Sequence, residues 1–318
     1  MAEIGQDIKK AASLLCIEDV VSIPTETVYG LAGNAFSEKA ILKIFEVKNR
    51  PLTDPLIVHV AGIEAILPLV VELPALAKQL FEAFSPGPLT ILLPKSNAIS
   101  NLVTNGSQFV AIRIPNHPLT LKLLQVLDFP LVAPSANPFG GLSPSLAEHV
   151  EKGLGNKISY ILDGGPCNVG LESTIVQIID NDRIKILRQG GISEEELLTF
   201  AALAQPKNDG KEVVPGSMLS HYAPQKRLLI QPVSEVLKKY KSDEIAFLGF
   251  DQYSELLSKE QQILLSATGN MKEAAQTLFS ALHVLDSLQV KVIVAAQIPE
   301  KGLGKAISDR LKRAAAKL

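Results

Sequence analysis

The sequence has few cysteines, no long apolar run and no N-terminal targeting pattern. Its two cysteines, Cys16 and Cys167, form no CxxC pair, which argues against a zinc site built from cysteines and favours a cytoplasmic protein with reduced thiols. No stretch approaches the ~18 consecutive apolar residues of a membrane span. The first ten residues, MAEIGQDIKK, lack the basic-then-apolar layout of a signal peptide. We therefore expect a cytoplasmic protein with no membrane contact.

The familiar motifs for nucleotide binding and hydrolysis are also missing. The chain contains no GxxxxGK[ST] loop, no GxGxxG opening a helix, no HExxH and no G-x-S-x-G elbow. A nucleotide site, if present, must therefore be built from other loops.

Charge is nearly balanced, with 31 Lys and Arg against 33 Asp and Glu. This argues against a protein whose main role is to coat nucleic acid, because such a protein would carry a basic stripe. The stretch 301–318 is an exception, with six basic residues and one acid. It is either the solvated face of a helix or a site of weak contact with tRNA or a partner.

Strand-like and helix-like segments alternate in the first two thirds of the chain. With 318 residues, 47% of them hydrophobic, the chain is long enough for two domains. Helical spacing predicts helices over 4–18, 37–47 and 74–84, the second capped by Ser37. Apolar runs predict strands at 20–24, 56–60, 89–93, 110–114, 131–133, 160–163, 173–179 and 183–187, the last taken as the final strand of the first domain. The mixture indicates an α/β or α+β domain with a central sheet.

A second unit of the same kind follows a polar, breaker-rich stretch. Residues 204–211 read AQPKNDGK, which is typical of a linker. Strands are predicted at 227–231, 244–250, 262–266 and 290–296, with a helix over 271–287, which favours a small βαβ domain with parallel strands. We therefore divide the chain into a first domain (1–203), a linker (204–225) and a C-terminal domain (226–318).

Polar groups follow the early strands, and each has an ordinary alternative. Thr25 and Thr27 could orient a small polar substrate or cap a turn. Lys48 and Arg50 suit a triphosphate, but they also suit the C-terminus of a helix. His59, on an apolar strand, is more often a satisfied core histidine than a ligand.

Arg113 and three glycine-containing loops complete the candidate chemistry. An arginine inside an apolar strand needs an anion, which a substrate carboxylate or an internal Asp would supply equally well. The loops at 133–143, 163–176 and 186–191 combine glycines with hydroxyl side chains, and the first can form an anion nest. So many polar loops at the ends of strands in one domain indicate a single large site.

Taken in order, these segments resemble the YrdC-domain threonylcarbamoyladenylate synthases. The resemblance spans nearly the whole chain and is carried by PTETVYGL, KNRP, DPLIVHV, PGPLT, AIRIP, APSANPFGGLSPS, GLESTIV and LRQGG. The SHYAP segment at 220–224 and the segment at 302–311 resemble the long, two-domain form of that family.

The resemblance implies a twisted open mixed sheet with helices and a smaller Rossmann-like α/β domain. It implies an enzyme that forms L-threonylcarbamoyladenylate and pyrophosphate from L-threonine, bicarbonate or CO₂, and ATP, the first step of threonylcarbamoyladenosine modification of tRNA. Mg²⁺ would accompany ATP, without a metal site made of protein ligands. The product would pass to the tRNA threonylcarbamoyl transferase, and contact with tRNA would be weak or indirect.

Site residues are implied at the positions that match the family motifs. The threonine pocket would be lined by Thr27, His59, Arg113, Ala133 and Ser173. ATP would be surrounded by Lys48, Arg50, Asp54, Ser135, Ser143, Arg188 and, from the linker, Tyr222. Lys48 and Arg50 would also act in catalysis by stabilising charge on the phosphates, and the linker would close over the nucleotide as a lid.

The sequence departs from the family pattern at a few positions, and two rival functions remain to be weighed. Asp54 replaces a usual Asn, and a carboxylate there would either repel the phosphates or recruit Mg²⁺; Ser85 replaces an aromatic residue, and 215–218 is reordered. A carbamoyltransferase of hydrogenase maturation shares this domain but needs zinc-finger cysteines. A non-catalytic RNA-binding module of the same fold is the main alternative.

Overall fold

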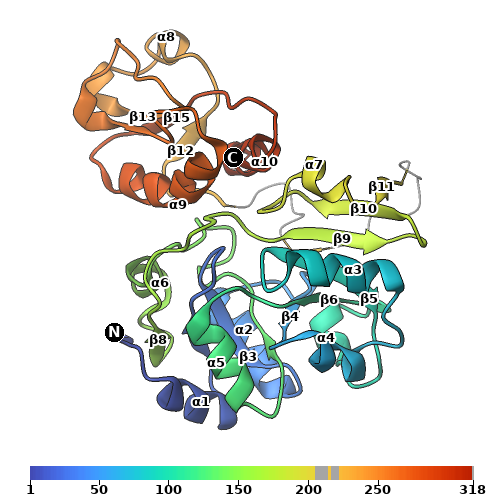
Figure 1. The fold of residues 1–318 in the computed structure, drawn as a ribbon. Helices are drawn as coiled ribbons and strands as arrows, with labels where there is room; N and C mark the ends of the chain where they lie inside the picture. The colour runs from blue at the N-terminus through green and yellow to red at the C-terminus, as the bar shows by residue number, and fades with distance from the viewer. Residues whose placement is uncertain (205–213, 216–221, 317–318) are drawn as a thin grey trace.

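The computed structural model describes residues 1–204, 214–215 and 222–316 of the chain. These residues form a larger α/β body built on one sheet and a smaller one built on a second sheet (Figure 1). No helix in these ranges is both long enough and apolar enough to cross a membrane.

The larger sheet is mixed and open, as predicted, and within the described residues it has 11 strands. Its edges are β1 and β11, so the sheet does not close on itself. In spatial order its strands are β1 (Glu3–Gly5), β8 (Tyr160–Leu162), β2 (Val21–Ile23), β3 (Gly30–Asn34), β7 (Leu131–Val132), β4 (Ile57–His59), β6 (Phe109–Arg113), β5 (Leu89–Pro94), β9 (Thr174–Ile178), β10 (Arg183–Arg188) and β11 (Ala202–Leu203).

Helices cover both faces of this sheet. The helical segments are α1 (Ile8–Cys16), α2 (Glu38–Lys48), the 3₁₀ segment η1 (Ile63–Leu69), α3 (Ala75–Phe84), α4 (Asn101–Thr104), α5 (Pro118–Val126), α6 (Ala147–Leu154) and α7 (Glu194–Leu197). Leu31 and Ala32, neighbours on β3, belong to two different core clusters, because successive strand residues point to opposite faces. One cluster contains residues of α2, α3 and α6, and the other contains residues of α1 and α5.

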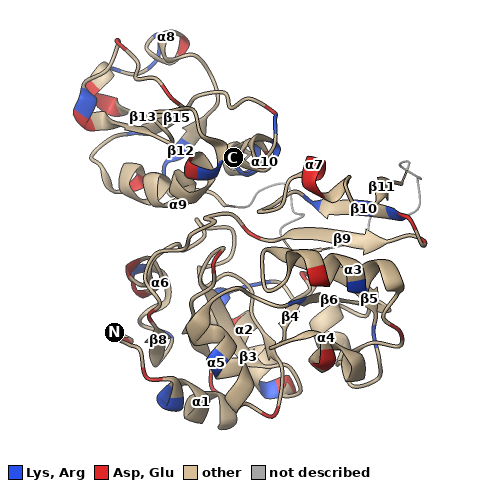
Figure 2. Cartoon of the chain, viewed as in Figure 1, with Lys and Arg blue, Asp and Glu red and all other residues tan. Residues whose placement is uncertain are grey.

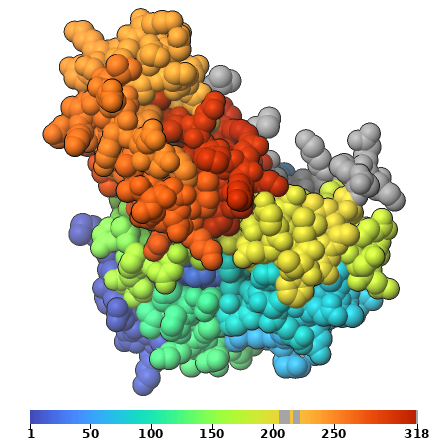
Figure 3. Space-filling view, turned by 45° about the horizontal axis from the view of Figure 1, so that its top comes forward, coloured from blue at the N-terminus to red at the C-terminus, as the bar shows by residue number. Residues whose placement is uncertain are grey.

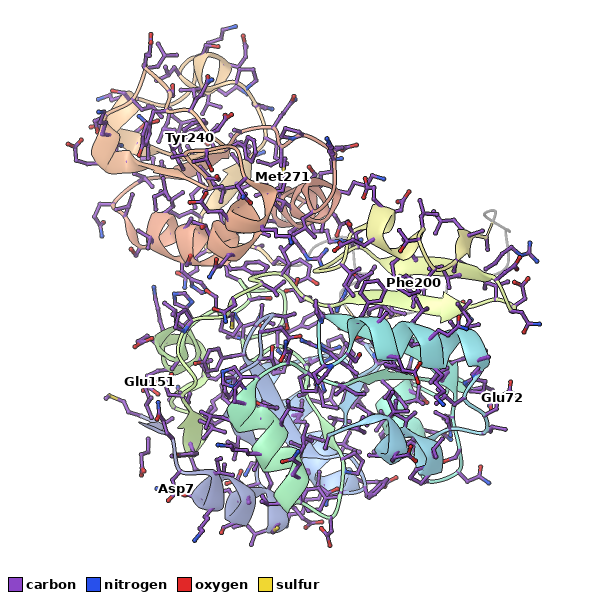
Figure 4. All side chains as sticks on the ribbon, viewed as in Figure 1. Asp7, Glu72, Glu151, Phe200, Tyr240 and Met271 are labelled. Atoms are coloured by element: carbon purple, nitrogen blue, oxygen red, sulfur yellow. The ribbon has the colours of Figure 1, made fainter. Side chains whose placement is uncertain are left out.

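A local sequence signal explains where α2 begins, and an aromatic contact fixes α3 against the far side of the sheet. Ser37 caps α2 as predicted, its hydroxyl accepting a hydrogen bond from the backbone N–H of Ala40. Phe200, labelled in Figure 4, lies just after α7. Its ring packs edge-on against Phe84 at the end of α3, with ring centroids 5.1 Å apart. This contact joins the β10 side of the sheet to the helix layer.

The smaller sheet is entirely parallel, which confirms the predicted βαβ arrangement. Its order is β12 (Arg227–Leu229), β15 (Val292–Ala295), β13 (Ile245–Gly249) and β14 (Gln262–Leu264). The helical segments are α8 (Val233–Val236), η2 (Ser242–Glu244), η3 (Lys259–Gln261), α9 (Met271–Ser287) and α10 (Gly304–Ala315). The helix predicted over 271–287 matches α9 at both ends.

The two bodies share a hydrophobic cluster. Val28 and Leu171 of the larger body pack in one cluster with Tyr222 and with Phe279 of α9. In the space-filling view the C-terminal segment, in red, lies against the yellow segment that carries β10 and α7 (Figure 3). The second domain therefore packs directly on the first.

Three predictions about the elements were wrong or incomplete. Residues 4–5 are not helical, because Glu3–Gly5 pairs in parallel with β8 and α1 begins only after Asp7. The strand β3 was not predicted, because its sequence GLAGN contains two glycines and looks like a loop. The strand at 183–187 is not the last of the larger sheet, because the short β11 pairs in parallel with it.

Candidate active site

Loops at the ends of several strands line one small, partly open cavity with a volume of about 50 Å³. It lies among residues that come from widely separated parts of the sequence. They are Thr27, Val28, Arg50, Pro55, Ile57, His59, Arg113, Ala133, Pro134, Ser135, Glu172, Ser173, Arg188, Pro215 and Tyr222. Most of the site residues expected from the sequence are in this group; Lys48, Asp54 and Ser143 are not.

Arg113 lies at the end of β6 and is held by an internal carboxylate. Its Nη2 donates to Glu26 Oε1 at 2.7 Å, and its Nε donates to the carbonyl of Gly87 at 3.3 Å. The second oxygen of Glu26 accepts the backbone N–H of Asn116 at 2.9 Å. Of the two anions weighed for Arg113, the internal one is therefore present, as Glu26 rather than an Asp. The arginine nonetheless lines the cavity, where it can also meet a ligand.

Hydroxyl groups and a neutral histidine surround Arg113. Thr27 Oγ1 lies 2.8 Å from Thr25 Oγ1, and Ser173 Oγ lies 2.6 Å from Thr90 Oγ1. His59, at the end of β4, contacts the carbonyl of Ile57 through Nδ1 at 3.1 Å. Burial and the charge of Arg113 lower the pKa of His59 to about 3, so its ring is neutral at physiological pH.

Arg188 ends β10 and connects the sheet to the linker. Its Nε and Nη2 both donate to the carbonyl of Ser173, and Nη2 also reaches Ser173 Oγ at 3.0 Å. Its Nη1 donates to the carbonyl of Pro215 at 2.9 Å. Because Pro215 and Tyr222 both line the cavity, described parts of the linker lie over the site. The rest of the expected lid, at 205–213 and 216–221, is outside the described residues.

Lys48 is buried behind the cavity wall at the C-terminus of α2. Its Nζ donates to the carbonyls of Ser135 and Asn137, both at 2.5 Å. Burial and the nearby charge of Arg50 hold the pKa of Lys48 well below its usual value. Lys48 therefore shapes the loop that begins at Ser135 and lies close to the cavity without lining it.

Asp54 pairs with Arg50 rather than facing the cavity. Arg50 donates to the carbonyls of Asp54 and Pro55, and its Nη2 lies 2.9 Å from Asp54 Oδ2. Among the described residues, neither carboxylate oxygen of Asp54 receives a hydrogen bond. Burial raises the pKa of Asp54, and the charge of Arg50 only partly opposes this. Asp54 therefore weakens the positive charge that Arg50 presents to the cavity.

Glu172 and Glu26 are the site residues that sequence reasoning missed. Glu172 lines the cavity and accepts a hydrogen bond from Ser143 Oγ at 2.6 Å. Ser143 therefore contacts the cavity wall through Glu172 but does not line the cavity itself. Its other oxygen accepts from Arg310 Nε at 2.7 Å. Both acids sit inside motifs noted in the sequence, but their partners are 87 and 138 positions away. Their position in loops next to strands was the only local signal, with Glu26 between β2 and β3 and Glu172 two residues before β9.

The basic C-terminal stretch is neither simply a solvated face nor a free basic patch. Arg310 is buried, and surface pairs join Lys305 to Glu194 and Lys312 to Glu300. Lys317 lies outside the described residues. Figure 2 shows blue and red interspersed on both bodies in this view, with no continuous basic stripe.

Comparison with known proteins shows which family this chain belongs to. Residues 13–190 match the Sua5/YciO/YrdC family model, described as telomere recombination. Residues 192–316 match the model described as threonylcarbamoyl-AMP synthase, C-terminal domain. The chain therefore belongs to the Sua5/YciO/YrdC family, in the two-domain form that includes this C-terminal domain.

Relatives of this two-domain form span almost the whole chain. The threonylcarbamoyl-AMP synthase of Pyrococcus abyssi is 36% identical over 96% of this chain and 93% of its own length. That of Bacillus subtilis is 37% identical over 97% and 92%. A crystal structure of P. abyssi Sua5 complexed with L-threonine superposes with a TM-score of 0.88 at 34% identity, covering 99% of this chain and 97% of the other.

Proposed function

We propose that this chain is an L-threonylcarbamoyladenylate synthase, which forms its product and pyrophosphate from L-threonine, bicarbonate or CO₂, and ATP. The observation that carries the proposal is the cavity itself, where Arg50, Arg113 and Arg188 converge with the hydroxyls of Thr27 and Ser173. Such a set suits one carboxylate and one polyphosphate. The near full-length relatives named threonylcarbamoyl-AMP synthase support the same activity.

Threonine is proposed to bind at the Arg113 end of the cavity. Arg113 takes the substrate carboxylate while Glu26 and the carbonyl of Gly87 keep its guanidinium in place. Thr27, His59, Ala133 and Ser173 form the rest of the pocket. Because His59 is neutral, it adds no second positive charge beside the amine that must react.

ATP is proposed to bind at the Arg188 end, with Arg50, Ser135 and Tyr222 on the wall and Lys48 and Ser143 just behind it. The cavity of about 50 Å³ is far below the roughly 300–1,000 Å³ typical of ligand pockets. Tyr222 and Pro215 must therefore move away for ATP to enter, and their return over the nucleotide is the proposed lid closure.

The proposed chemistry needs position and charge rather than a covalent enzyme intermediate. The threonine amine adds to CO₂ or bicarbonate, and an oxygen of the resulting carbamate attacks the α-phosphorus as pyrophosphate leaves. Holding the reactants in line is worth roughly 7–11 kcal/mol. The charge of Arg50 stabilises the departing phosphates, whereas Lys48 acts from behind the wall by holding the loop that begins at Ser135. Exclusion of water matters because the carbamate hydrolyses readily.

Mg²⁺ is proposed to arrive with ATP rather than to occupy a site made of protein ligands. Among the described residues, no cluster of three or more His, Cys, Asp or Glu side chains could hold a metal. Glu172 is engaged by Ser143 and Arg310, whereas the oxygens of Asp54 receive no hydrogen bond from the described residues. The donor set thus fits an ion held mainly by phosphates, because Asp54 is paired with Arg50 and does not line the cavity. Bound there, Mg²⁺ would neutralise phosphate charge.

The proposed reaction also implies partner molecules and a cellular location for this protein. The adenylate is an activated intermediate, so a tRNA threonylcarbamoyl transferase must consume it, and contact of this chain with tRNA is weak or indirect. We propose that the activity is cytoplasmic, since ATP and the tRNA modified through its product are both present there.

The test is pyrophosphate release from ATP by the purified chain with Mg²⁺ and bicarbonate, with and without L-threonine. We expect release that requires both threonine and bicarbonate, and D-threonine serves as the matched control. Tight RNA binding without pyrophosphate release would overturn the proposal and leave the non-catalytic RNA-binding module.

A further inference from the structure

Arg310, on α10 of the C-terminal domain, is the largest fully buried side chain in the described part of the chain. Other basic residues of α10 lie at or near the surface; the side chain of Lys312, two positions on, is 66% exposed. Burying a guanidinium is costly unless its hydrogen bonds and its charge are satisfied. The surroundings of Arg310 must therefore explain why this one base points inward.

Two of the three hydrogen bonds described for the guanidinium of Arg310 go to the other domain. Nε donates to Glu172 Oε2 at 2.7 Å, and Nη2 donates to the carbonyl of Gln189 at 2.9 Å. Only Nη1 is used within its own helix, on Asp309 Oδ2 at 2.7 Å. Glu172 and Gln189 flank the strand pair β9–β10, so Arg310 ties α10 to the part of the sheet that carries Arg188.

Glu172 is a wall of the proposed ATP site, and it would repel a triphosphate if it were left unpaired. The groups that face it are Arg310 from α10, Arg188 from β10, Tyr222 from the linker and the hydroxyl of Ser143. Burial alone would raise the pKa of Glu172, but the charges of Arg310 and Arg188 together with the Ser143 hydrogen bond hold it below its ordinary value. Arg310 therefore keeps Glu172 ionised and at the same time cancels its charge.

Arg310 also supports the linker tyrosine. Its guanidinium carbon lies 4.9 Å from the centre of the Tyr222 ring, and Phe279 of α9 packs against the same ring at 5.9 Å between centroids. Tyr222 has φ of 61°, a left-handed conformation that costs a residue with a side chain roughly 1–2 kcal/mol. Contacts from two helices of the C-terminal domain thus hold Tyr222 in a conformation that the linker alone would disfavour.

We propose that Arg310 is a positioning residue for the nucleotide half of the site, through which the C-terminal domain neutralises Glu172 and fixes Tyr222 over the cavity. The inference rests on the proposed function for the identity of the ligand, ATP. Under this proposal the C-terminal domain has a role in the reaction. The larger domain cannot supply that role, because the contacts to Tyr222 and Glu172 come from α9 and α10.

The experiment compares Arg310→Met with Arg310→Lys and with the surface control Lys312→Gln. Pyrophosphate release gives KM for ATP and for threonine, and calorimetry gives the Kd for ATP. For Arg310→Met we expect ATP KM and Kd to rise about 10- to 30-fold, because an unpaired buried carboxylate then faces the phosphates. Threonine KM should stay within about threefold, Arg310→Lys should recover part of the loss, and Lys312→Gln should match the wild type.

A second substitution separates this role from ordinary domain packing. In Glu172→Gln/Arg310→Met the unpaired charge is gone but the support of Tyr222 is still missing, so the ATP Kd should fall at least threefold relative to Arg310→Met alone while staying above that of the wild type. For the same reason, the ATP Kd of Arg310→Met should approach the wild-type value, measured at the same pH, as the pH is lowered and the buried, unpaired Glu172 takes up a proton.

The inference is overturned if Arg310→Met leaves ATP binding unchanged, or weakens both substrates equally with no rescue by Glu172→Gln and no dependence on pH. If the Arg310→Met protein does not fold, Arg310→Lys and the double variant test the proposal instead. Both leave the net charge of the Glu172–Arg310 pair unchanged. If the wild type binds ATP but releases no pyrophosphate, the proposed function fails while the calorimetric comparison still tests Arg310.

Discussion

The two halves of the cavity are built in different ways. The partners of Arg113 are Glu26 and Gly87, and they belong to the larger domain, as does Thr27 in the nearby cavity wall. Around Arg188, the wall is completed by Pro215 and Tyr222 of the linker and by Glu172, which Arg310 of the C-terminal domain holds from behind. The proposed threonine half is therefore complete within one domain, and the proposed ATP half is assembled from three parts of the chain. Substitutions should separate the two halves.

The largest effect is expected for Arg113→Ala. Loss of a charge-assisted pair to the substrate carboxylate, typically about 2–5 kcal/mol for a buried charge, should raise threonine KM roughly 100-fold or more. ATP KM should change less than about threefold. Initial rates of pyrophosphate release measure both. The control is Arg183→Gln on the exposed end of β10, whose partner is Asp180. Equal loss for both substrates would instead mark Arg113 as a structural residue.

Tyr222→Ala should show the opposite preference. It removes an aromatic wall of the cavity and the ring on which Arg310 rests, and aromatic contacts to a nucleotide base are worth about 1–3 kcal/mol. We expect ATP Kd to rise about tenfold by calorimetry, with a much smaller change in threonine KM. The exposed Tyr253→Ala serves as the matched control. A selective loss of threonine binding would contradict the division of the site.

Asp54→Asn is expected to have a smaller effect, in the favourable direction. The substitution removes a buried negative charge 2.9 Å from Arg50, so Arg50 should present more positive charge to the phosphates. ATP KM should fall about threefold while threonine KM stays constant. A rise in ATP KM that excess Mg²⁺ relieves would show instead that the carboxylate holds the metal ion.

The smallest effect concerns the packing of the two domains. His149 and His283 stack with ring centroids 3.8 Å apart, one from each domain, and His283 also contacts the carbonyl of Ser143. Burial, then the charge of His283, lowers the pKa of His149 to about 3, and burial also lowers that of His283. As the pH falls, these two histidines therefore become protonated in the unfolded chain before they do in the folded one. The stability contributed by the neutral histidine pair is complete above about pH 6.5 and is lost as the pH falls below it.

At pH 5 we expect this pair to lower the free energy of unfolding by about 1 kcal/mol relative to pH 7, after allowance for its partial exposure. Thermal unfolding at the two pH values measures the change. His283→Phe keeps an aromatic ring but cannot titrate, so its melting temperature should depend less on pH. An unchanged dependence on pH would show that the histidine pair does not govern acid sensitivity.

The sequence predicted the elements with regular patterns and most of the cavity wall. The helix at α9 and the parallel C-terminal strands follow from apolar periodicity, and Arg113 was singled out because an arginine in an apolar strand needs an anion. Strand β3 was missed because its glycines weaken the local strand signal. It forms because it pairs with β2 on one side and with β7 on the other. Partners such as Glu26 and Arg310 could not be predicted, because their contacts span 87 and 138 positions.

The same contrast explains why the role of the C-terminal domain was not predicted. In the sequence, Arg310 is one of six bases in a helix-like stretch with an ordinary amphipathic pattern. Only the fold shows that it is buried while Lys312 is exposed. Contacts within one segment can be read from spacing, but contacts between domains depend on how both have folded.

The most direct test of the account is the identity of the product. The purified chain is incubated with ATP, Mg²⁺, L-threonine and ¹³C-bicarbonate, and the nucleotides are analysed by mass spectrometry. The account predicts an adenylate that contains threonine and one ¹³C atom, formed together with pyrophosphate. Formation of AMP or ADP alone, or of an adenylate without the label, would contradict it.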